Sequence, residues 1–393
     1  MSRLNPYRLL AVDLEPTPYK ADLWNAFAAD PAWKVKVLYT HARDHSADAG
    51  HRYTQMPPIH FSYHVLGEHS WWGSLKKMLV VMRRVAARQT DGVFISGYVD
   101  PGPLAAIFSA ALVGKPFFVH SDVFNQAQPK GRFALLKGIM RDALRRFIFL
   151  RARAILVCGQ AGYASALAVG CPPSKIIDFP YVVDRKRLMS DQPSSVPTEI
   201  LEDREQLDTI FYFSARMIER KGLGTLLSAL AELDRLEGSR NPNWRVWIAG
   251  DGPQLIHYQA LSKRLGIDQQ VRWMGFVQMA LHSYLLRKTD GVIVPSLSDA
   301  WGIVVDEGMQ LGKAVITTPA VGSAIDRITD QHNGRIVPPG DAGALATAMH
   351  MLIANPKQRL ELGQQAQQHA SQFDPKRNVA HLRAVIDNTH ECT

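Results

Sequence analysis

The segment GVIVPSLSDAWGIVVDEGMQLGKAVITTP, residues 291–319, predicts a strand, a loop, a helix and a second strand in close succession. Its apolar run GVIVPS is of strand length, and SLSDAW is a polar loop. GIVVDEGMQLG follows a helical pattern that Gly312 ends, and a new apolar run begins at Ala314. Strand, helix and strand in this order are typical of a parallel sheet covered by helices.

The same alternation extends along most of the chain in both directions. Short apolar runs are separated by amphipathic segments of helical length, which predicts an α/β fold. The predicted strands are residues 8–14, 34–40, 92–97, 116–122 and 154–159 in the first half, and 209–215, 245–251, 271–276, 291–296 and 314–319 in the second.

Two domains are expected, because 393 residues exceed what one hydrophobic core usually organises and 46% of them are apolar. Residues 190–208 are rich in Pro, Ser and acids, which predicts a linker. We therefore expect an N-terminal domain in 1–189 and a C-terminal domain in 209–370. Residues 371–393 hold a predicted C-terminal helix that could pack back on the first domain.

The overall charge favours an anionic partner but does not identify it. The net charge is +9 and the pI is about 9.4, which fits a nucleotide, a phosphorylated substrate, a membrane face or nucleic acid. Nucleic acid is the least favoured, because no recognised motif accompanies the basic residues. The amino terminus has no secretory signal, and the apolar run 104–114 is too short to span a bilayer, so we expect a cytoplasmic protein.

The three cysteines do not form a pattern that predicts chemistry. Cys158, Cys171 and Cys392 are too scattered for a disulfide framework and lack zinc-ligand spacing, so we expect inert packing thiols and no metal site.

Two basic residues and two glycines follow predicted strands. Arg216 and Lys221 flank the turn into a helix, whose first N–H groups are unpaired, and together they could hold a diphosphate. Gly250 and Gly252 permit close approach of a ligand to the backbone. Solvated surface cations and an ordinary tight turn would give the same patterns, and from these residues alone both alternatives stay open.

Two carboxylates bracket the apolar part of residues 291–319. Asp299 falls in the loop after the strand, and Glu307 lies about one turn into the helix, on the same face as Ile303. A carboxylate on a buried face is costly unless it accepts hydrogen bonds. The vicinal hydroxyls of a sugar are suitable donors, although a helix-capping Asp299 with a salt-bridged Glu307 explains the pattern equally well.

Five segments of the second half, taken together and in order, resemble the C-terminal half of the retaining family 4 glycosyltransferases. They are FSARMIERKGLGTLLSAL, WIAGDGP, VRWMGFV, PSLSDAWGIVVDEGMQLGKAVITT and HNGRIVPPGDAGALATAM, spread over residues 209–353. The first half is similar only loosely, through GKPFFVHSD, RARAILVCGQAGYASALAVG and FPYVVD. The resemblance implies the GT-B fold, in which two Rossmann-like domains have parallel sheets that face a central cleft.

The resemblance also implies roles for residues at the matching positions. Arg216 and Lys221 are expected to bind the donor diphosphate, Glu307 the nucleotide ribose and Asp299 the donor sugar. Asp299 stands where glutamate is common in the family, a variant in which DAWG follows the strand. His120 is similar in place to a family histidine near the transferred sugar. The remaining candidates are Trp301, Gly302, Ile303, Gly250, Gly252 and Phe276 for the donor, and Asp122 and Tyr98 for the acceptor.

One loop departs from the family pattern. Many relatives have a glycine-rich turn after the first strand, whereas this chain has DLEPTPYKADLW at residues 13–24, with prolines that stiffen the loop. Acceptor contacts through this loop are therefore not predicted.

The implied reaction is transfer of a sugar, with retention, from a nucleotide-diphosphate sugar to an acceptor hydroxyl. UDP and GDP are the expected nucleotides, and the acceptor is a sugar, a lipid-linked molecule or a small molecule, as in the synthesis of polysaccharides, glycolipids or glycosylated metabolites. The chain has no D-x-D pair, so we expect neither a metal nor a further cofactor. The alternatives are another GT-B enzyme, such as a nucleotide-sugar epimerase or a phosphorylase, and a non-catalytic nucleotide-sugar-binding protein.

A basic segment, KGRFALLKGIMRDALRRFIFLRAR at residues 130–153, carries eight basic residues and one acid. It could lie on an anionic membrane surface, with Trp71 and Trp72 as further anchors, or it could be a packed helix with a solvated basic side. A helical pattern groups Lys137, Arg141 and Arg145 on one face and Leu136, Met140, Leu144 and Ile148 on another.

Overall fold

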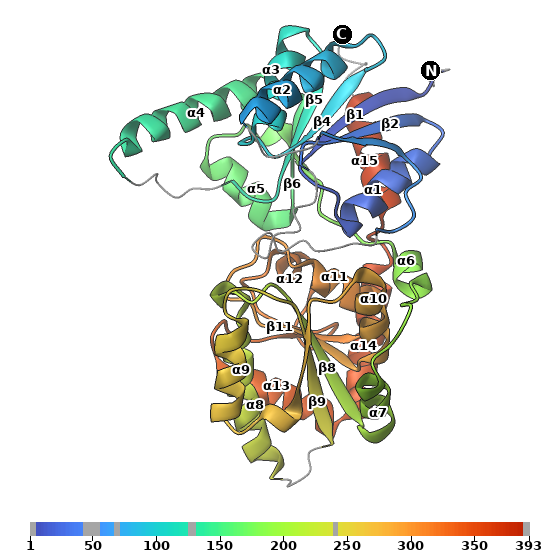
Figure 1. The fold of residues 1–393 in the computed structure, drawn as a ribbon, viewed down its shortest axis with the longest axis vertical. Helices are drawn as coiled ribbons and strands as arrows, with labels where there is room; N and C mark the ends of the chain where they lie inside the picture. Colours follow the sequence, from blue (N-terminus) through green and yellow to red (C-terminus); the bar gives the residue numbers. More distant parts are fainter. Residues whose placement is uncertain (1–4, 42–55, 67–70, 125–130, 239–242, 388–393) are drawn as a thin grey trace. The chain divides into compact units, whose positions relative to one another are not determined.

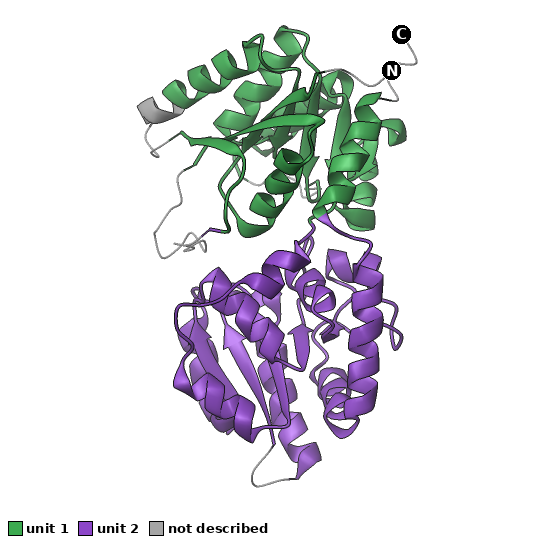
Figure 2. Ribbon diagram, turned by 90° about the vertical axis from the view of Figure 1, so that its right-hand side faces the viewer, with its two compact units in different colours: residues 1–44, 57–181, 375–393 green, residues 45–56, 182–374 purple. Residues whose placement is uncertain are grey.

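The computed structural model describes residues 5–41, 56–66, 71–124, 131–238 and 243–387, with the side chains of 71–74 outside the description. The chain forms two compact units (Figure 2). Unit 1 is built on residues 1–44, 57–181 and 375–393, and unit 2 is built mainly on residues 182–374. The predicted anchors Trp71 and Trp72, as side chains, and Cys392 lie outside the described residues.

Unit 1 is a parallel sheet covered by helices (Figure 1). In the described residues its strand order is β3-β2-β1-β4-β5-β6-β7, so the order reverses between β1 and β4. The strands are β1 (Tyr7–Asp13), β2 (Trp33–Tyr39), β3 (Ser62–Val65), β4 (Gly92–Ser96), β5 (Phe117–Ser121), β6 (Ala154–Val157) and β7 (Ile176–Asp178). The helices are α1 (Pro18–Ala29), α2 (Trp71–Ala86), α3 (Pro101–Leu112), α4 (Ala134–Arg151), α5 (Gly159–Ala168) and α15 (Pro375–Asp387).

Unit 2 repeats this architecture. Its parallel sheet has the order β10-β9-β8-β11-β12-β13 in the described residues, and the order reverses between β8 and β11. The strands are β8 (Thr209–Ser214), β9 (Trp244–Ala249), β10 (Val271–Gly275), β11 (Gly291–Val294), β12 (Ala314–Thr317) and β13 (Arg335–Ile336). The helices are α6 (Arg185–Ser190), α7 (Thr198–Gln206), α8 (Leu223–Glu237), α9 (Leu255–Arg264), α10 (Met279–Lys288), α11 (Ile303–Gln310), α12 (Gly322–Arg327), α13 (Ala342–Ala354) and α14 (Pro356–Ala370).

The buried strands carry apolar residues on both faces, as a sheet covered by helices on both sides requires. On β8, Phe211 and Phe213 pack with one hydrophobic cluster, while Ile210 and Tyr212 pack with another on the opposite face. This alternation fixes the direction of every side chain on β8, including those at its carboxyl end.

The predicted α/β fold with two Rossmann-like units is confirmed, and each predicted strand lies within two residues of an observed one. The prediction missed β3, β7 and β13. These strands have four, three and two residues and are too short to show a periodic pattern.

Residues 190–208, predicted as a linker, contain the helix α7, which packs within unit 2. Ile200 on α7 is 1% exposed. The Asp203 carboxylate, 2% exposed, accepts hydrogen bonds from Arg245, Arg272 and the Trp247 indole, two of them from one arginine. At least one acid of this segment therefore stabilises the packing of unit 2. The composition of the segment, which predicted a linker, did not indicate this role.

The C-terminal helix α15 lies in unit 1, where it packs on α1. The Asn378 amide on α15 donates to the Pro180 carbonyl at 2.7 Å. Among the helices described, none has the length and apolar character needed to cross a membrane.

Candidate functional site

The candidate donor residues gather at the carboxyl edge of the sheet in unit 2. Arg216 and Lys221 follow β8, and Asp299 and Glu307 follow β11. β8 and β11 are neighbours where the strand order reverses, which is the place where open α/β sheets bind ligands. The loops that follow the two strands contact each other, since the Leu297 N–H donates to the Arg220 carbonyl at 2.8 Å.

Lys221 and Asp299 form an ion pair in the structure. The Lys221 ammonium lies 2.5 Å from the Asp299 carboxylate, and the two side chains are 17% and 11% exposed. Arg220 approaches the other Asp299 oxygen at 3.8 Å and donates to the Ser298 carbonyl at 3.1 Å. Gly222 allows this arrangement, because it has φ 72° and a Cβ there would overlap the Pro295 carbonyl after β11. The cation and the acid predicted to touch the donor thus lie next to each other.

Glu307 is held by a histidine. Its carboxylate oxygen Oε2 lies 2.9 Å from His282 Nε2, and His282 Nδ1 lies 2.9 Å from the Tyr212 hydroxyl. Glu307, His282 and Tyr212 are all buried. The salt-bridged alternative for Glu307 therefore has a partner in the structure, and it is a histidine on α10.

The loop before α11 is held by a second buried group. The Trp301 indole N–H donates to Asp306 at 2.7 Å, and the Arg327 guanidinium contacts the same carboxylate at 3.2 Å and lies over the Trp301 ring. Burial raises the pKa of Asp306 to about 6, although Arg327 and the indole oppose the shift. The Trp301 side chain is thus buried and is held by contacts within unit 2.

The first residues of α11 offer backbone donors. Gly302 adopts φ 81° just before the helix, a conformation that favours glycine. Within the described part of the chain, no acceptor faces the N–H groups of Gly302 and Ile303, and such groups at a helix start attract anions.

Other donor candidates have simpler explanations. At Gly250 a Cβ would overlap the Ala215 carbonyl, and at Gly252 it would lie 2.8 Å from the Met217 backbone. Both glycines therefore allow two loops to pack together, whether or not a ligand binds. Arg216 is exposed at the end of β8, and Phe276, just after β10, is half-buried.

His120 lies at the carboxyl end of β5 in unit 1 and is buried. Its Nε2 lies 3.1 Å from the Phe179 carbonyl, and its ring packs against Phe94, Phe179 and Tyr181. Burial lowers the pKa of His120, so the imidazole is neutral at pH 7.

The two acceptor candidates differ in accessibility. Asp122 is partly exposed and accepts a hydrogen bond of 2.5 Å from the Tyr181 hydroxyl, and burial followed by the Asp122 charge raises the pKa of Tyr181 well above its ordinary value. Tyr98, in contrast, is 8% exposed, stacks on Phe124, and its hydroxyl accepts from Arg145. Tyr98 is therefore part of the core of unit 1.

The loop after β1 is held by an ion pair and hydrogen bonds to Asp13. The Asp13 carboxylate is fully buried and accepts hydrogen bonds from the Lys20 ammonium, the Leu14 N–H and the Trp24 indole. Burial would lower the pKa of Lys20, but the Asp13 charge outweighs it and the pKa is raised. The loop that lacks the glycine-rich turn is thus fixed by an internal ion pair.

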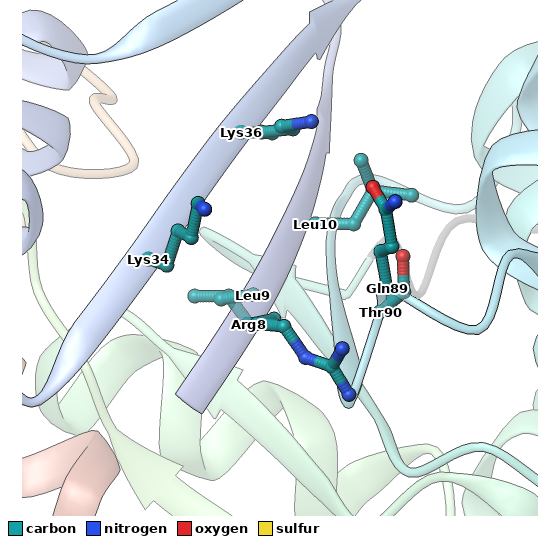
Figure 3. Close-up of a pocket in the computed structure, with 7 residues that line it drawn as sticks. All are labelled: Arg8, Leu9, Leu10, Lys34, Lys36, Gln89 and Thr90. Atoms are coloured by element: carbon teal, nitrogen blue, oxygen red, sulfur yellow. The ribbon is translucent and has the colours of Figure 1, made fainter. Parts of the chain in front are cut away.

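A cavity of about 300 Å³ lies at the opposite, amino edge of the sheet in unit 1 (Figure 3). Arg8, Lys34 and Lys36 line it, and Arg8 is already paired with Asp91. The cavity lies at the amino ends of the strands, whereas the candidate residues lie at the carboxyl ends. It is therefore not part of the candidate site.

Sequence reasoning missed His282, Arg220 and Arg327. Arg220 is next to Lys221 and was open to the same argument. His282 and Arg327 come from α10 and α12, and no pattern in the sequence indicated which way those helices turn toward the site.

A comparison with known families finds a match over part of the chain. Residues 201–369 match the family Glycosyl transferases group 1. The match lies within unit 2 and includes Arg216, Lys221, Asp299 and Glu307.

Curated relatives are glycosyltransferases by name. The chain is 31% identical to D-inositol 3-phosphate glycosyltransferase 2 of Catenulispora acidiphila, over 42% of this chain and 39% of that protein. It is 24% identical to alpha-D-kanosaminyltransferase of Streptomyces kanamyceticus, over 75% of this chain and 77% of that protein. For the first two relatives the matched part spans only about two fifths of their length.

Solved structures resemble the whole chain. Anabaena Alr3699/HepE in complex with UDP has a TM-score of 0.73 at 17% identity, covering 97% of this chain and all of that one. Sucrose-phosphate synthase of Thermosynechococcus elongatus has a TM-score of 0.72 at 16% identity, covering 98% of this chain and all of that one. The fold is therefore that of the GT-B glycosyltransferases.

Proposed function

We propose that this chain is a retaining glycosyltransferase of family 4 with the DAWG form of the two-acid motif. It transfers a sugar from a nucleotide-diphosphate sugar, with UDP or GDP as the nucleotide, to an acceptor hydroxyl. The observation that carries the proposal is the pairing of Lys221 with Asp299 beside the exposed Arg216 and the buried Glu307, at the strand ends where the sheet order reverses.

Each of these groups has a use in such a reaction. Arg216, Lys221 and the N–H groups at the start of α11 would stabilise the negative charge that develops on the departing diphosphate. Asp299 and Glu307 would accept hydrogen bonds from hydroxyls of the donor sugar and of the ribose. The name of the Anabaena structure, which contains UDP, agrees with a nucleotide donor.

The proposal is tested by a thermal-shift screen of the whole chain over UDP-, GDP-, ADP- and TDP-sugars, followed by transfer assays with the donor that stabilises it. Stabilisation by one donor and sugar transfer to an added acceptor are expected. Conversion of the donor without any acceptor would instead favour an epimerase, and phosphate-dependent release of a sugar phosphate from a polymer would favour a phosphorylase. Binding without turnover would indicate a binding protein.

Retention is proposed from the resemblance to the family 4 enzymes. How it would be achieved is suggested by the two acids, because neither is arranged as a nucleophile. Asp299 is paired with Lys221 and Glu307 with His282, so same-face attack by the acceptor, assisted by the departing phosphate, is the simplest route. The anomeric configuration of the product, measured by NMR, tests this step, and inversion would reject it.

We further propose that the reaction needs no metal ion, because two cationic side chains and a helix start are available for the diphosphate. Full activity in excess chelator is expected. Loss of activity that Mg²⁺ or Mn²⁺ restores would contradict this part of the proposal.

Finally, we propose that α4 binds an anionic membrane surface on the cytoplasmic side and brings the enzyme to a lipid-linked acceptor. One correction to the sequence analysis is needed, since Arg145 is 3% exposed and faces Tyr98 instead of lying on a solvated basic face. The amino-terminal half of α4 and the residue before it nevertheless expose large apolar side chains beside Lys137 and Arg141. These side chains are Phe133, Leu135, Leu136, Ile139 and Met140.

Liposome flotation tests the membrane proposal. The chain should float with vesicles that contain phosphatidylglycerol, and not with neutral vesicles or at high salt. The double variant Leu135→Ser/Ile139→Ser should lose binding, while Leu236→Ser, an exposed leucine on α8, should keep it. Binding that ignores both salt and lipid charge would reject the proposal.

A further inference from the structure

His282 occupies an unusual place for a histidine on a surface-facing helix. It lies on α10, is 8% exposed, and contacts Glu307 on α11 and Tyr212 on β8. Three elements that are separate in sequence thus meet at one imidazole ring, and both ring nitrogens have a polar partner. Such complete pairing is what a buried polar group requires.

The direction of the hydrogen bonds follows from the chemistry of the partners. An ionised carboxylate can only accept, so His282 Nε2 carries the proton that it donates to Glu307. With Nε2 protonated, the Nδ1 of a neutral imidazole accepts, and the Tyr212 hydroxyl donates to it. The Ser214 hydroxyl, at 3.5 Å from Nδ1, is a more distant second donor.

This arrangement orients the Glu307 carboxylate. Oxygen Oε2 is occupied by His282, whereas Oε1 has no partner among the residues the structure describes. The residue is 7% exposed, so a carboxylate with no donor there would suffer a large desolvation cost. His282 reduces that cost and leaves one oxygen for a ligand.

We infer that His282 is a positioning residue for donor binding, which fixes the Glu307 carboxylate toward the nucleotide ribose and is itself fixed by Tyr212. The inference rests on the proposed function, because it assumes that Glu307 accepts hydrogen bonds from ribose hydroxyls. His282 does not touch the substrate and acts only through Glu307. The same network joins β8, which ends beside Arg216, to the helix that carries Glu307.

A histidine that merely filled space would have different consequences. Its replacement would lower stability, and ligand affinity would fall for all nucleotides alike. A positioning role instead predicts loss of discrimination between nucleotides that differ in one ribose hydroxyl. The discriminating measurement is therefore the ratio of the dissociation constants for UDP and 2′-deoxy-UDP, measured by titration calorimetry on the full chain, together with the same ratio for the GDP and ADP pairs.

The expected results are specific. Wild type should bind the ribonucleotide about tenfold more tightly, since a hydrogen bond to a charged group is worth about 1.4 kcal/mol or more. His282→Phe, which keeps the ring but removes the donor, should bring the ratio close to that of Glu307→Ala. His282→Gln, which can still donate to Glu307, should restore much of the preference. In transfer assays His282→Phe should raise KM for the donor more than it lowers kcat.

Two further variants test whether the effect comes from this hydrogen-bond network or from a general loss of stability. Tyr212→Phe removes only the hydroxyl that supports Nδ1 and should reduce the ratio partly. Tyr258→Phe is the matched control, because this buried tyrosine of unit 2 donates to Gln254 at 2.8 Å on α9's amino end and should leave the ratio unchanged.

The outcomes separate the two levels of inference. If wild type discriminates and His282→Phe, folded by circular dichroism, discriminates equally, the role of His282 is overturned while the proposed function stands. If wild type binds ribo- and deoxyribonucleotides equally, the ribose role of Glu307 is overturned together with this inference. If wild type binds no nucleoside diphosphate at all, the proposed function itself fails.

Discussion

The Lys221–Asp299 pair shows how single residues prepare the candidate site. An ammonium and a carboxylate at 2.5 Å, both less than one fifth exposed, hold each other in place before any ligand is bound. A diphosphate near Lys221 and sugar hydroxyls near Asp299 would each contact a group already oriented by the other.

We predict that Lys221→Ala lowers the transfer rate by about a hundredfold or more, the usual effect of losing one donor to a developing oxyanion. Kinetics with saturating donor measure this effect. Lys263→Ala, which removes an exposed lysine on α9, is the control and should be unaffected. Equal rates for wild type and Lys221→Ala would show that the pair is only structural.

Asp306 gives a pH dependence of stability. Its pKa is about 6 in the folded chain against 3.8 for the free side chain, because burial disfavours the charged form. The protonated form therefore stabilises the fold, and this contribution is fully present below pH 3.8 and lost as the pH rises through about 6.

We predict that the stability of wild type relative to Asp306→Asn falls by about 2 kcal/mol between pH 4 and pH 7. Urea unfolding of both proteins across this range measures the difference. A difference that stays constant with pH would mean that Asp306 titrates as it does in the unfolded chain.

At the scale of elements, α7 depends on one buried acid. Burial alone would raise the pKa of Asp203, but hydrogen bonds from Arg272 and Trp247 and the charge of Arg245 outweigh it, so the pKa is lowered. The charged carboxylate thus stabilises the packing of α7 on the sheet of unit 2 at neutral pH, and this contribution is lost as the pH falls through the lowered pKa.

We predict that Asp203→Ala destabilises unit 2 by about 3–5 kcal/mol, because it leaves two arginines and an indole without their acceptor. Glu205→Ala, on the exposed side of the same helix, should change stability little. Thermal unfolding followed by circular dichroism checks both variants, and equal melting temperatures for them would contradict the prediction.

Elements with a long periodic pattern were predictable from the sequence, and so were the positions of the candidate residues that follow them directly. Arg216, Asp299 and Glu307 come after apolar runs that fix the ends of β8 and β11. His282 could not be placed, because its role depends on how α10 packs against α11. Arg145 was misplaced for the same reason: a helical pattern shows which residues share a face, but not which face meets the core.

For the whole molecule, the C-terminal helix links the stability of unit 1 to the end of the chain. α15 buries Val379, Leu382 and Ile386 within unit 1, at about 1.5–3 kcal/mol for each buried side chain.

We predict that truncation after Asp374 lowers the melting temperature of unit 1 strongly and leaves nucleotide binding by unit 2 intact. Differential scanning calorimetry with and without UDP distinguishes the two units, because only the transition of the unit that binds ligand shifts. Truncation after Asp387 is the control. A melting profile unchanged by the longer deletion would contradict the prediction.

The route of the chain has a consequence for biosynthesis. The polypeptide leaves unit 1 after Tyr181 and returns to it at Pro375, so unit 2 is an insertion between two parts of its neighbour. A ribosome releases all of unit 2 before it releases α15, and domains fold as units while the chain emerges. Synthesis of unit 1 therefore begins before that of unit 2, but unit 1 is completed after it. Until α15 is released, the surface of α1 that it covers is exposed, and chaperones or other chains can bind there.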